Sequence, residues 1–521
     1  MDLDIPQCTI TDIMASHACH FPNKTALVFG ERRISWGEMN RGINRVANRL
    51  LSAGLERGDK VATLMRTSLD HFYVFFGAMK AGGVIVPVSS LLSPDQVGGL
   101  VEDAGAKFLF TDETHQQMLD SSAERLGRVR PDGFFSTQEG ARWRGLDAWL
   151  AGASEEEPRV RLMSDDDANI SYSSGTTGVP KGVVYSHRAR LHFGFAYAMH
   201  MHIDTATVGI GTTPLYSNGT SIIMYPTLFA GGTLVFMDGF DAGRLQRMIE
   251  QEHITHTFMV PTQFVKLLGH PEFGQYDLSS MKRYITAGSP MRLDLKQEVM
   301  AKLGPRLSEL YGLSEGGVTM IRPDELVERP ASCGTPLPGF ECRILGPDDR
   351  EVARGETGEI AFYGGWAMRR YHGRPEQTRE ATWRDERGRS FVRTGDIGRM
   401  DDDGYVFVVD RKKDMIISGG FNIFPADIES VLAQHPAVLD VCVVGAAHPL
   451  WGESPVAAVI LRSGAVLEAG ELKEWANARL AKTQRLAALM LRDDFPRNAM
   501  GKVVKPDLRR EYADLLMKQP A

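Results

Sequence analysis

The chain has 521 residues, of which 43% are hydrophobic and 24% are charged, and its net charge at pH 7 is −7. This composition is typical of a globular protein of two or more domains, and the acidic balance excludes nucleic acid as the main partner. The five cysteines show no CxxC spacing and are odd in number, so we expect free thiols in a reducing cytoplasm.

Neither the first residues nor the apolar stretches predict a membrane segment. Asp2, Asp4 and Pro6 interrupt the start, so no secretory signal is expected. The stretches 72–88 and 221–237 contain glycine pairs and are shorter than the ~20 residues that a membrane span needs. We expect each to fold as a buried helix, a glycine turn and a buried strand.

The first 110 residues alternate strands with helices. Residues 25–29 and 33–36 predict a hairpin, and apolar residues at helical spacing then predict a helix that ends at Gly54. The pattern continues as strand, helix, strand, helix and strand at residues 61–65, 72–80, 84–88, 94–104 and 107–111. Such alternation predicts a parallel sheet with helices on both faces.

The later chain suggests two domains. Residues 151–167 predict an acidic surface connection, after which strands and helices resume at 233–237, 242–251 and 256–260. Beyond residue 401 the pattern becomes a compact α+β arrangement that opens with a strand at 404–409. We predict an α/β protein with a large N-terminal domain, residues 1–410, that holds parallel and mixed sheets in several subdomains, and a small α+β C-terminal domain, residues 411–521.

The segment SYSSGTTGVPKG, residues 171–182, is rich in groups that bind phosphate. Glycines let backbone N–H groups approach an anion, hydroxyls add donors, and a lysine adds a mobile charge. A mobile Ser/Gly surface loop is the alternative, which the hydroxyl density and the PKG ending disfavour. Because Pro180 stands where the GxxxxGK[ST] pattern needs glycine, a Ras-like or kinase-like enzyme is disfavoured too. The predicted phosphate-binding residues are Ser173, Ser174, Gly175, Thr176, Thr177, Gly178 and Lys181.

Two further segments carry groups that suit a nucleotide. In YGLSE, residues 311–315, a tyrosine can stack on a base, a hydroxyl can meet a phosphate, and a carboxylate can hold Mg²⁺. The same stretch could be a helix cap, and GLSEG also matches the GxSxG nucleophile elbow of hydrolases. In RTGD, residues 393–396, an aspartate on a turn can accept both ribose hydroxyls, although by itself the segment could be an ordinary turn.

Two more segments lie at and beyond the predicted boundary. DRKKD, residues 410–414, precedes SGGFN, residues 418–422. Its arginine can reach ribose or phosphate, and the glycine pair allows close approach to a ligand, but charges at a junction are often only a solvated linker. PRNAMGK, residues 496–502, places a lysine on a glycine-containing hairpin, where a solvent-facing side chain is the alternative.

In this order and spacing, the five segments resemble the ANL family of adenylate-forming enzymes, over nearly the whole chain. That family holds acyl- and aryl-CoA synthetases, peptide-synthetase adenylation domains and firefly-type luciferases. The resemblance implies a carboxylic acid, ATP and Mg²⁺ as reactants and cofactor. It implies an acyl-adenylate that forms with release of pyrophosphate, a thiol that then displaces AMP, and a C-terminal domain that is mobile between the two half-reactions.

The resemblance also implies roles for residues of the N-terminal domain. Residues 173–178 and Lys181 correspond to the ATP phosphate loop. Tyr311 corresponds to the aromatic residue that stacks on adenine, Ser314 to a phosphate contact, and Glu315 to the Mg²⁺-binding acid. We therefore expect Lys181 and Glu315 to act in catalysis.

Beyond residue 390 the resemblance implies four more roles. Asp396 corresponds to the ribose ligand, with Arg411 beside it. Lys413 occupies the hinge position between the domains. Lys502 corresponds to the catalytic lysine that adenylation requires.

The acceptor is expected to be coenzyme A, because SGGFNIFPADIE, residues 418–429, is similar to the form common in CoA synthetases. Ser418, Gly419 and Gly420 are the expected CoA-binding residues. The acid pocket is harder to assign. Many relatives have a His or aromatic gate where this chain has Ser217, and its walls are neutral, with His256 expected to be structural. We predict a fatty or aromatic monocarboxylic acid and a pocket formed by Tyr216, Ser217, Phe258, Ala287 and Gly288.

Three other functions stay open at this point. A stand-alone adenylation enzyme or a luciferase-like enzyme would share every adenylation motif. A GxSxG serine hydrolase would use Ser314 but would leave the phosphate loop unexplained. We expect a cytoplasmic enzyme of fatty acid metabolism whose partners are small molecules, and a homodimer is one assembly that the sequence allows.

Overall fold

The computed structural model describes residues 7–121, 123–173, 180–419, 421–497, 503–513 and 515–517. The chain divides into two units: unit 1 holds residues 1–342 and 361–393, and unit 2 holds residues 343–360 and 394–521. The predicted α/β class, with a large N-terminal and a smaller C-terminal part, is confirmed. The boundary between residues 410 and 411 stays a prediction.

Unit 1 opens with helix α1 (Ile10–His20), a hairpin and an amphipathic helix. Strand β1 (Thr25–Phe29) pairs antiparallel with β2 (Arg32–Ser35), and α2 (Trp36–Ser52) follows. The Ser35 hydroxyl accepts from the Glu38 N–H, and the Glu38 carboxylate accepts from the Ser35 N–H, which forms a capping box. The sequence had predicted that Trp36 ends the second strand. Because of this cap, Trp36 instead begins the helix.

Two sheets, parallel in their middle strands, form the framework of unit 1. The nine-stranded sheet has the order β16-β15-β14-β13-β12-β10-β11-β1-β2, and the eight-stranded sheet has the order β19-β9-β8-β4-β3-β5-β6-β7. The first sheet contains β10 (Val208–Gly211), β11 (Thr233–Phe236), β12 (His256–Met259), β13 (Arg283–Thr286), β14 (Leu307–Gly312), β15 (Val318–Ile321) and β16 (Thr335–Pro336). The second contains β3 (Lys60–Leu64), β4 (Val84–Pro87), β5 (Ala106–Thr111), β6 (Phe134–Ser136), β7 (Arg144–Gly145), β8 (Asp167–Ser173), β9 (Lys181–Ser186) and β19 (Arg370–Tyr371).

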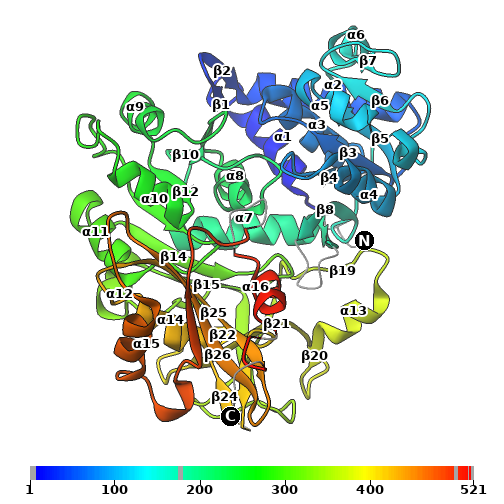
Figure 1. The fold of residues 1–521 in the computed structure, drawn as a ribbon. Coiled ribbons are helices and arrows are strands. Elements are labelled where there is room, and N and C mark those ends of the chain that lie inside the picture. Colours follow the sequence, from blue (N-terminus) through cyan, green and yellow to red (C-terminus); the bar gives the residue numbers. More distant parts are fainter. Residues whose placement is uncertain are drawn as a thin grey trace. The chain divides into compact units, whose positions relative to one another are not determined.

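Helices α3 (Leu69–Lys80) and α8 (Asn218–Ala230) are buried on almost every side. A helix that is apolar all round belongs in a core, and both contribute to one apolar cluster with residues of the two sheets. In Figure 1, α8 lies between the blue strands of unit 1 and its green strands, beside α7 (His187–Met201). The prediction for stretches 72–88 and 221–237 is therefore confirmed. Of the described helices, none combines the length and hydropathy needed to cross a bilayer.

The remaining helices of unit 1 cover the sheets or cap their ends. Helix α4, for example, starts at Pro94 after the Ser93 cap and ends before Gly105, which is left-handed at φ 65°. They are α4 (Pro94–Ala104), α5 (Glu113–Asp120), α6 (Leu146–Leu150), α9 (Ala242–Glu252), α10 (Pro261–Leu268), α11 (Leu293–Leu303), α12 (Pro323–Glu328) and α13 (Pro375–Glu380).

A five-stranded sheet has the order β17-β18-β21-β20, with β22 paired to β21. The division between the units falls inside three of these strands. The predicted strand 404–409 starts two residues later, because Gly404, at φ 88°, forms a turn in which its N–H donates to the Asp401 carbonyl. The strands are β17 (Phe340–Leu345), β18 (Thr357–Gly364), β20 (Thr382–Arg384), β21 (Ser390–Met400) and β22 (Val406–Arg411).

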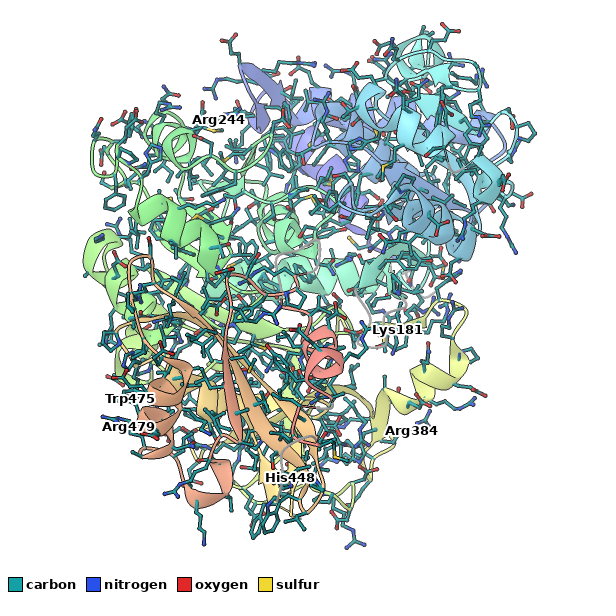
Figure 2. The ribbon with its side chains drawn as sticks, in the orientation of Figure 1. Lys181, Arg244, Arg384, His448, Trp475 and Arg479 are labelled. Carbon is teal, nitrogen blue, oxygen red and sulfur yellow. The ribbon has the colours of Figure 1, made fainter. Side chains whose placement is uncertain are left out.

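The C-terminal part of unit 2 is an α+β fold with a core on each face of its sheet. Successive strand residues point to opposite faces, so Val443 joins one core while Cys442 and Val444 join the other. At the surface, the Arg479 guanidinium lies 4.1 Å from the Trp475 ring centroid (Figure 2). The elements are β23 (Ile416–Ser418), β24 (Phe421–Ile423), β25 (Val438–His448), β26 (Gly452–Leu461), β27 (Ala488–Leu491), α14 (Pro425–Leu432), α15 (Ala469–Asn477) and α16 (Lys505–Tyr512). Within the described part of the chain, no disulfide joins any of the five cysteines.

Candidate active site

Several predicted site residues of unit 1 follow the carboxyl ends of its strands. β12, β13 and β14 are parallel neighbours, so their carboxyl ends lie at one edge of the sheet. In open α/β sheets this edge is where ligands bind. Ser314 and Glu315 follow β14, and Ala287 and Gly288 follow β13. Ser173 is the last residue of β8, whereas Ser174, Gly175, Thr176, Thr177 and Gly178 lie outside the described residues.

Lys181 and Glu315 approach the same tyrosine. Lys181, labelled in Figure 2, begins β9, and its Nζ lies 4.9 Å from the centroid of the Tyr371 ring. The Tyr371 hydroxyl donates to Oε1 of Glu315 over 2.8 Å. Burial and the nearby Glu315 carboxylate raise the pKa of Tyr371, so the tyrosine stays a donor and Glu315 stays its acceptor.

The Ser314 side chain and backbone are each held by one residue. The Asn218 Nδ2 donates to Ser314 Oγ over 3.0 Å, and the Tyr185 hydroxyl donates to the Ser314 carbonyl. Burial raises the pKa of Tyr185 to about 12, so this hydroxyl keeps its proton. Among the described residues no histidine hydrogen-bonds to Ser314, so the nucleophile–base pair of a hydrolase is missing. Ser314 also stands between β14 and β15, whereas the GxSxG elbow leads from a strand into a helix.

The turn after Ser314 requires glycine. Gly316 and Gly317 have φ of 116° and 99°, and a Cβ at Gly317 would lie 2.2 Å from a ring carbon of Phe362. Phe362 is also the aromatic neighbour of Tyr311, with ring centroids 6.2 Å apart. The two glycines therefore let the motif turn tightly against the strand that carries Phe362.

The structure brings the predicted acid-pocket segments together. The Ser217 hydroxyl accepts from the Gly219 N–H and caps α8, directly after Tyr216. A Cβ at Gly219 would lie 2.6 Å from the Phe258 ring, so α8 begins against β12. Ala287 is buried, and Gly288, at φ 91°, faces the side chain of Val260. The first turn of α8, the end of β12 and the loop after β13 therefore adjoin one another.

His256 has a structural role, as the sequence suggested. Its ring nitrogens lie 2.8 Å from the Thr255 hydroxyl and 3.0 Å from the Met201 carbonyl oxygen. Burial lowers the pKa of His256 to about 4, so the ring is neutral at pH 7. It stands at the first residue of β12, whereas Phe258 is near the other end of that strand.

In unit 2, Asp396 and Arg411 form an ion pair. They are cross-strand neighbours on β21 and β22, and Arg411 Nε lies 2.7 Å from Asp396 Oδ1. Gly395, at φ 69°, makes the bend that precedes Asp396, and its carbonyl accepts from the Lys412 N–H. The structure thus confirms that Arg411 lies beside Asp396.

The predicted hinge residue lies between two anchored segments of unit 2. The Asp410 carboxylate accepts from the Ala426 N–H at the start of α14. The Lys413 carbonyl accepts from Arg509 of α16 over 2.9 Å. Lys413 is therefore tied to α16 through its own carbonyl, and the preceding Asp410 is tied to α14.

The predicted CoA-binding turn packs against a tryptophan of unit 2. The Gly419 N–H donates to the Trp451 carbonyl, and a Cβ at Gly419 would lie 2.8 Å from the indole ring. Ser418 pairs with Gly452 in the sheet, and the Trp451 side chain is largely exposed. Gly420 and Lys502 lie outside the described residues; on either side of Lys502, Arg497 and Val503 form a bridge.

Comparisons with known proteins identify the family. The model of the AMP-binding enzyme family matches residues 14–372, and that of the AMP-binding enzyme C-terminal domain matches residues 427–502. The chain belongs to the AMP-binding enzyme family. The resemblance to the ANL adenylate-forming enzymes is therefore confirmed.

Relatives of this AMP-binding enzyme match it over nearly its whole length. Feruloyl-CoA synthase of an Amycolatopsis species is 32% identical over 94% of this chain and 96% of that protein. The indoleacetate–CoA ligase of Aromatoleum aromaticum is 33% identical over 95% of this chain and 97% of that protein. Among solved structures, ATP-bound MatB from Rhodopseudomonas palustris matches with a TM-score of 0.87 and 29% identity, over 98% of this chain and 100% of that one.

The residues of this AMP-binding enzyme fit a magnesium ion that takes few of its ligands from the protein. No group of three or more His, Cys, Asp or Glu residues in the described part of the chain could hold a metal. Mg²⁺ commonly keeps several waters and takes one or two carboxylates plus substrate phosphates. The single carboxylate of Glu315, oriented by Tyr371, fits that pattern.

Sequence reasoning missed Tyr371, Asn218 and Tyr185. Tyr371 belongs to no motif and reaches Glu315 because β19 pairs with β9, with Tyr371 opposite Val183. Asn218 had a usable signal, since it follows Ser217 at the start of a helix expected to be buried. Tyr185 lies on β9 beyond the predicted phosphate segment, which ended at residue 182, in a run for which the sequence gave no prediction.

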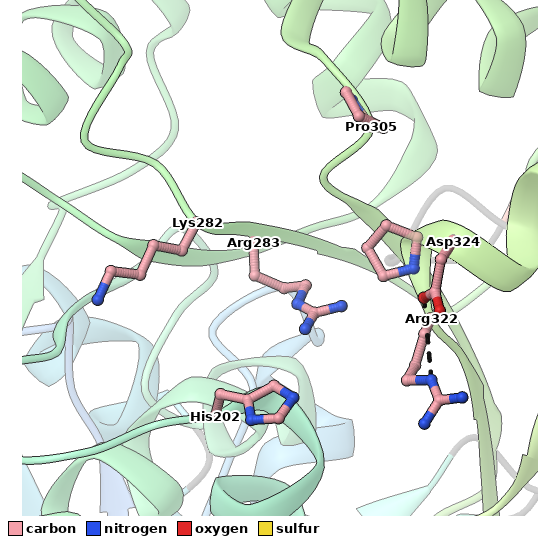
Figure 3. A pocket seen from close by; sticks show the side chains of 7 residues that line it. His202, Lys282, Arg283, Pro305, Arg322 and Asp324 are labelled. Carbon is pink, nitrogen blue, oxygen red and sulfur yellow. Dashed lines mark ion pairs between the residues drawn. The ribbon is translucent and has the colours of Figure 1, made fainter.

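An open hollow of about 510 Å³ lies at the opposite end of β13 from Ala287. It is lined by His202, Lys282, Arg283 and Arg322, with Asp324 paired to Arg322 (Figure 3). Because β13 runs from Arg283 to Thr286, this basic hollow and the predicted acid pocket are at opposite edges of the sheet. The hollow is therefore not the acid pocket.

Proposed function

We propose that this enzyme is a carboxylic acid–CoA ligase. It activates a fatty or aromatic monocarboxylic acid with ATP to an acyl-adenylate, releases pyrophosphate, and then forms the acyl-CoA thioester with release of AMP. The observation that carries the proposal is the grouping of Lys181 and Glu315 around Tyr371, with Ser314 beside Glu315, on a chain similar over most of its length to proteins named as a CoA synthase and a CoA ligase.

The nucleotide would be held by charges and oriented donors. Lys181 supplies a cation for the phosphates, Ser314 supplies a hydroxyl, and Tyr311 offers a ring to the adenine. Attack of the acid on the α-phosphate concentrates negative charge, which preorganised donors and cations stabilise. Glu315 would hold a Mg²⁺ ion, which would supply further charge stabilisation at the phosphates.

Neutral pocket walls favour a monocarboxylic acid. Phe258 and Ala287 are buried apolar residues, and Tyr216, Ser217 and Gly288 carry no charge at pH 7. A second carboxylate in such a pocket would lack a cation, and burying it unpaired costs several kcal/mol. Relatives named for an aromatic acid and for long-chain fatty acids, such as the long-chain-fatty-acid–CoA ligase FadD13 of Mycobacterium tuberculosis, support both chemical classes.

We propose that CoA enters beside the Ser418–Gly419 turn after the predicted C-terminal domain, residues 411–521, has rotated about Lys413. Lys502, in the family's adenylation role, would act before this rotation and leave afterwards. One relative favours a second acceptor: the fatty acid–[acyl-carrier-protein] ligase ScoC of Streptomyces coeruleorubidus is 31% identical over 97% of this chain. A carrier protein is therefore the second candidate for the thiol.

The test is acid-dependent exchange of labelled pyrophosphate into ATP across a panel of fatty, aromatic and dicarboxylic acids. Exchange should need both Mg-ATP and an acid, and AMP should appear when CoA is added. Formation of ADP, or turnover without acid, would contradict adenylation. In a parallel assay, a fluorophosphonate probe should leave Ser314 unlabelled. Stoichiometric labelling of Ser314 would instead support the serine hydrolase alternative. The acceptor is identified by comparing the rate of thioester formation with CoA and with a holo-carrier protein in its place.

A further inference from the structure

Arg190 is a buried cation whose partners are neutral. It lies on α7 and is only 2% exposed. Its guanidinium carbon lies 3.8 Å from the ring centroid of Tyr185 and 5.1 Å from that of Tyr225. Among the described residues no carboxylate lies within ion-pair distance of Arg190, and its hydrogen bond goes from Nε to the amide oxygen of Asn169 over 2.6 Å. Burying an arginine without a carboxylate is costly, so its charge calls for a functional explanation.

A chain of hydrogen bonds leads from Arg190 to the nucleotide motif. The Asn169 Nδ2 donates to Ser171 Oγ over 3.1 Å, and the Ser171 hydroxyl donates to Asn218 Oδ1 over 3.3 Å. The Asn218 Nδ2 then donates to Ser314 Oγ over 3.0 Å. Asn169 and Ser171 are buried on β8, the strand that leads into the predicted phosphate loop.

The arginine fixes the direction of every bond in this chain. A guanidinium can only donate, so the Asn169 amide must turn its oxygen to Arg190 and its NH₂ to Ser171. Ser171 accepts there and therefore donates onward, which turns the Asn218 NH₂ to Ser314. Ser314 Oγ accepts at the end of the chain, so its own proton is left to donate. Bonds aligned in this way polarise one another, and a cation at the first donor strengthens the effect.

Arg190 also touches the residue that holds the Ser314 backbone. It stacks on Tyr185, whose hydroxyl donates to the Ser314 carbonyl. Two atoms of Ser314 are thus held by groups that both depend on the position of one guanidinium. A displaced Arg190 would loosen the hydroxyl and the backbone together.

We propose that Arg190 is a positioning residue that, through Asn169, Ser171 and Asn218, fixes the Ser314 hydroxyl as a donor to a phosphate oxygen of the nucleotide. The inference rests on the proposed adenylation, in which Ser314 meets a phosphate. Arg190 does not touch the nucleotide in this account. Its charge acts through oriented neutral groups, which spares the site a mobile cation and keeps Ser314 in one orientation.

The experiment interrupts this chain of hydrogen bonds, the relay, by a substitution at each of two residues. Ser171→Ala removes one oxygen atom from the middle of the relay, and Arg190→Met removes its source while keeping much of the volume. Loss of a neutral hydrogen bond predicts that Ser171→Ala lowers kcat/KM for ATP in pyrophosphate exchange about 3- to 10-fold. Arg190→Met should lower it about 10- to 100-fold, because charge-assisted bonds are roughly twice as strong. The double variant should be no worse than Arg190→Met alone, and KM for CoA should be unchanged in thioester formation from a synthetic acyl-adenylate.

The control is Gln246→Leu, which removes a buried polar side chain whose hydrogen bond among the described residues lies within α9. It should leave KM for ATP at the wild-type value. If Ser171→Ala behaves as wild type, or if the two losses multiply, the relay is wrong. Equal losses in kcat/KM for ATP and for CoA, accompanied by a matching drop in Tm, would show that Arg190 has only a structural role. If Arg190→Met fails to fold, Ser171→Ala still tests the chain of hydrogen bonds.

Failure of the proposed function gives a different result. In that case the wild type would show no exchange with any acid. Equilibrium binding of Mg-ATP to the intact protein then tests the relay by itself. Weaker binding by Ser171→Ala supports the relay, and unchanged binding overturns it.

Discussion

Arg190 in unit 1 and Arg411 in unit 2 hold their charges in opposite ways. Arg190 is buried between two tyrosine rings and donates to a neutral amide. Arg411 is paired with the carboxylate of Asp396 across two strands, with its own side chain half exposed to solvent. Arg411 belongs to a segment that the sequence assigned to nucleotide binding. Arg190 lies on α7, the helix that follows β9, whose first residue is Lys181.

The difference shows two ways in which this protein holds the charge of an arginine. A carboxylate partner largely cancels the charge, so a ligand of Asp396 has to compete with Arg411. A neutral partner leaves the charge uncancelled, and aligned hydrogen bonds can carry its influence to a distant hydroxyl. Unit 1 therefore presents fixed donors, whereas unit 2 presents a pair that a ligand can rearrange.

The largest expected effect concerns Lys502, which is proposed to act in adenylation. Lys502→Ala should lower acyl-adenylate formation by roughly 10²- to 10³-fold, the usual loss for one preorganised donor. Thioester formation from synthetic acyl-adenylate and CoA should stay near the wild-type rate. Single-turnover assays of each half-reaction measure both. The exposed Lys482→Ala is the control, and equal loss in both half-reactions would make Lys502 structural.

Lys413→Pro should separate the same half-reactions in the opposite sense. Proline fixes φ at about −65° and removes the torsion through which a hinge turns. The Lys413 N–H makes no hydrogen bond to any described residue, so proline removes none of them. We expect acyl-adenylate formation to persist and thioester formation to be lost in single-turnover assays. Wild-type rates for both would place the hinge elsewhere.

Ser217→Phe should act on the acid pocket. A ring at the start of α8 should lower kcat/KM for bulky acids more than for small ones, by about 10- to 200-fold, since even one methylene changes a pocket by that much. The cap on Gly219 is lost as well, at a cost of about 0.5–2 kcal/mol in stability. Ser217→Ala loses the cap without adding volume. The ratio of kcat/KM between the two variants therefore reports the effect of the ring alone. Equal losses for small and large acids would remove Ser217 from the pocket.

Asp396→Asn tests the ion pair of unit 2. If Asp396 accepts the ribose hydroxyls, loss of its charge should raise KM for ATP about 10- to 150-fold, the usual worth of a hydrogen bond to a charged group. Steady-state kinetics with ATP measure this. Lys412→Met is the matched control, because that neighbouring cation pairs with Glu359 instead. A similar rise in both variants would point to general loss of charge.

The last prediction concerns stability and not the rate of the reaction. Burial lowers the pKa of His71, His187 and His256 to about 4, below the ordinary 6.5. The folded chain then binds fewer protons than the unfolded chain, so stability falls as pH falls from about 6.5 to about 4. Each histidine should change the unfolding equilibrium about tenfold per pH unit in that window. His256→Gln should flatten the dependence of Tm on pH, and the exposed His20→Gln should not.

Local patterns were enough to predict most of the helices and strands around the site. The Ser93 cap and Gly105 gave α4 its bounds, and the glycine pairs divided the apolar stretches correctly. The relay could not be predicted in the same way, because Asn218 and Ser314 are 96 positions apart and Arg190 and Asn169 are 21 apart. A partial signal existed, since Asn169 and Ser171 are polar residues at alternate positions of β8.

The Gly419 turn has a consequence for spectroscopy. Trp36, Trp143, Trp149 and Trp366 are buried, whereas the indole of Trp451 is 55% exposed and rests on that turn. A soluble quencher such as acrylamide should therefore reach the emission of Trp451 before that of the four buried indoles. Any molecule that covers the turn would shield this indole from the quencher. The chain thus carries its own fluorescent reporter at the place where CoA is proposed to bind.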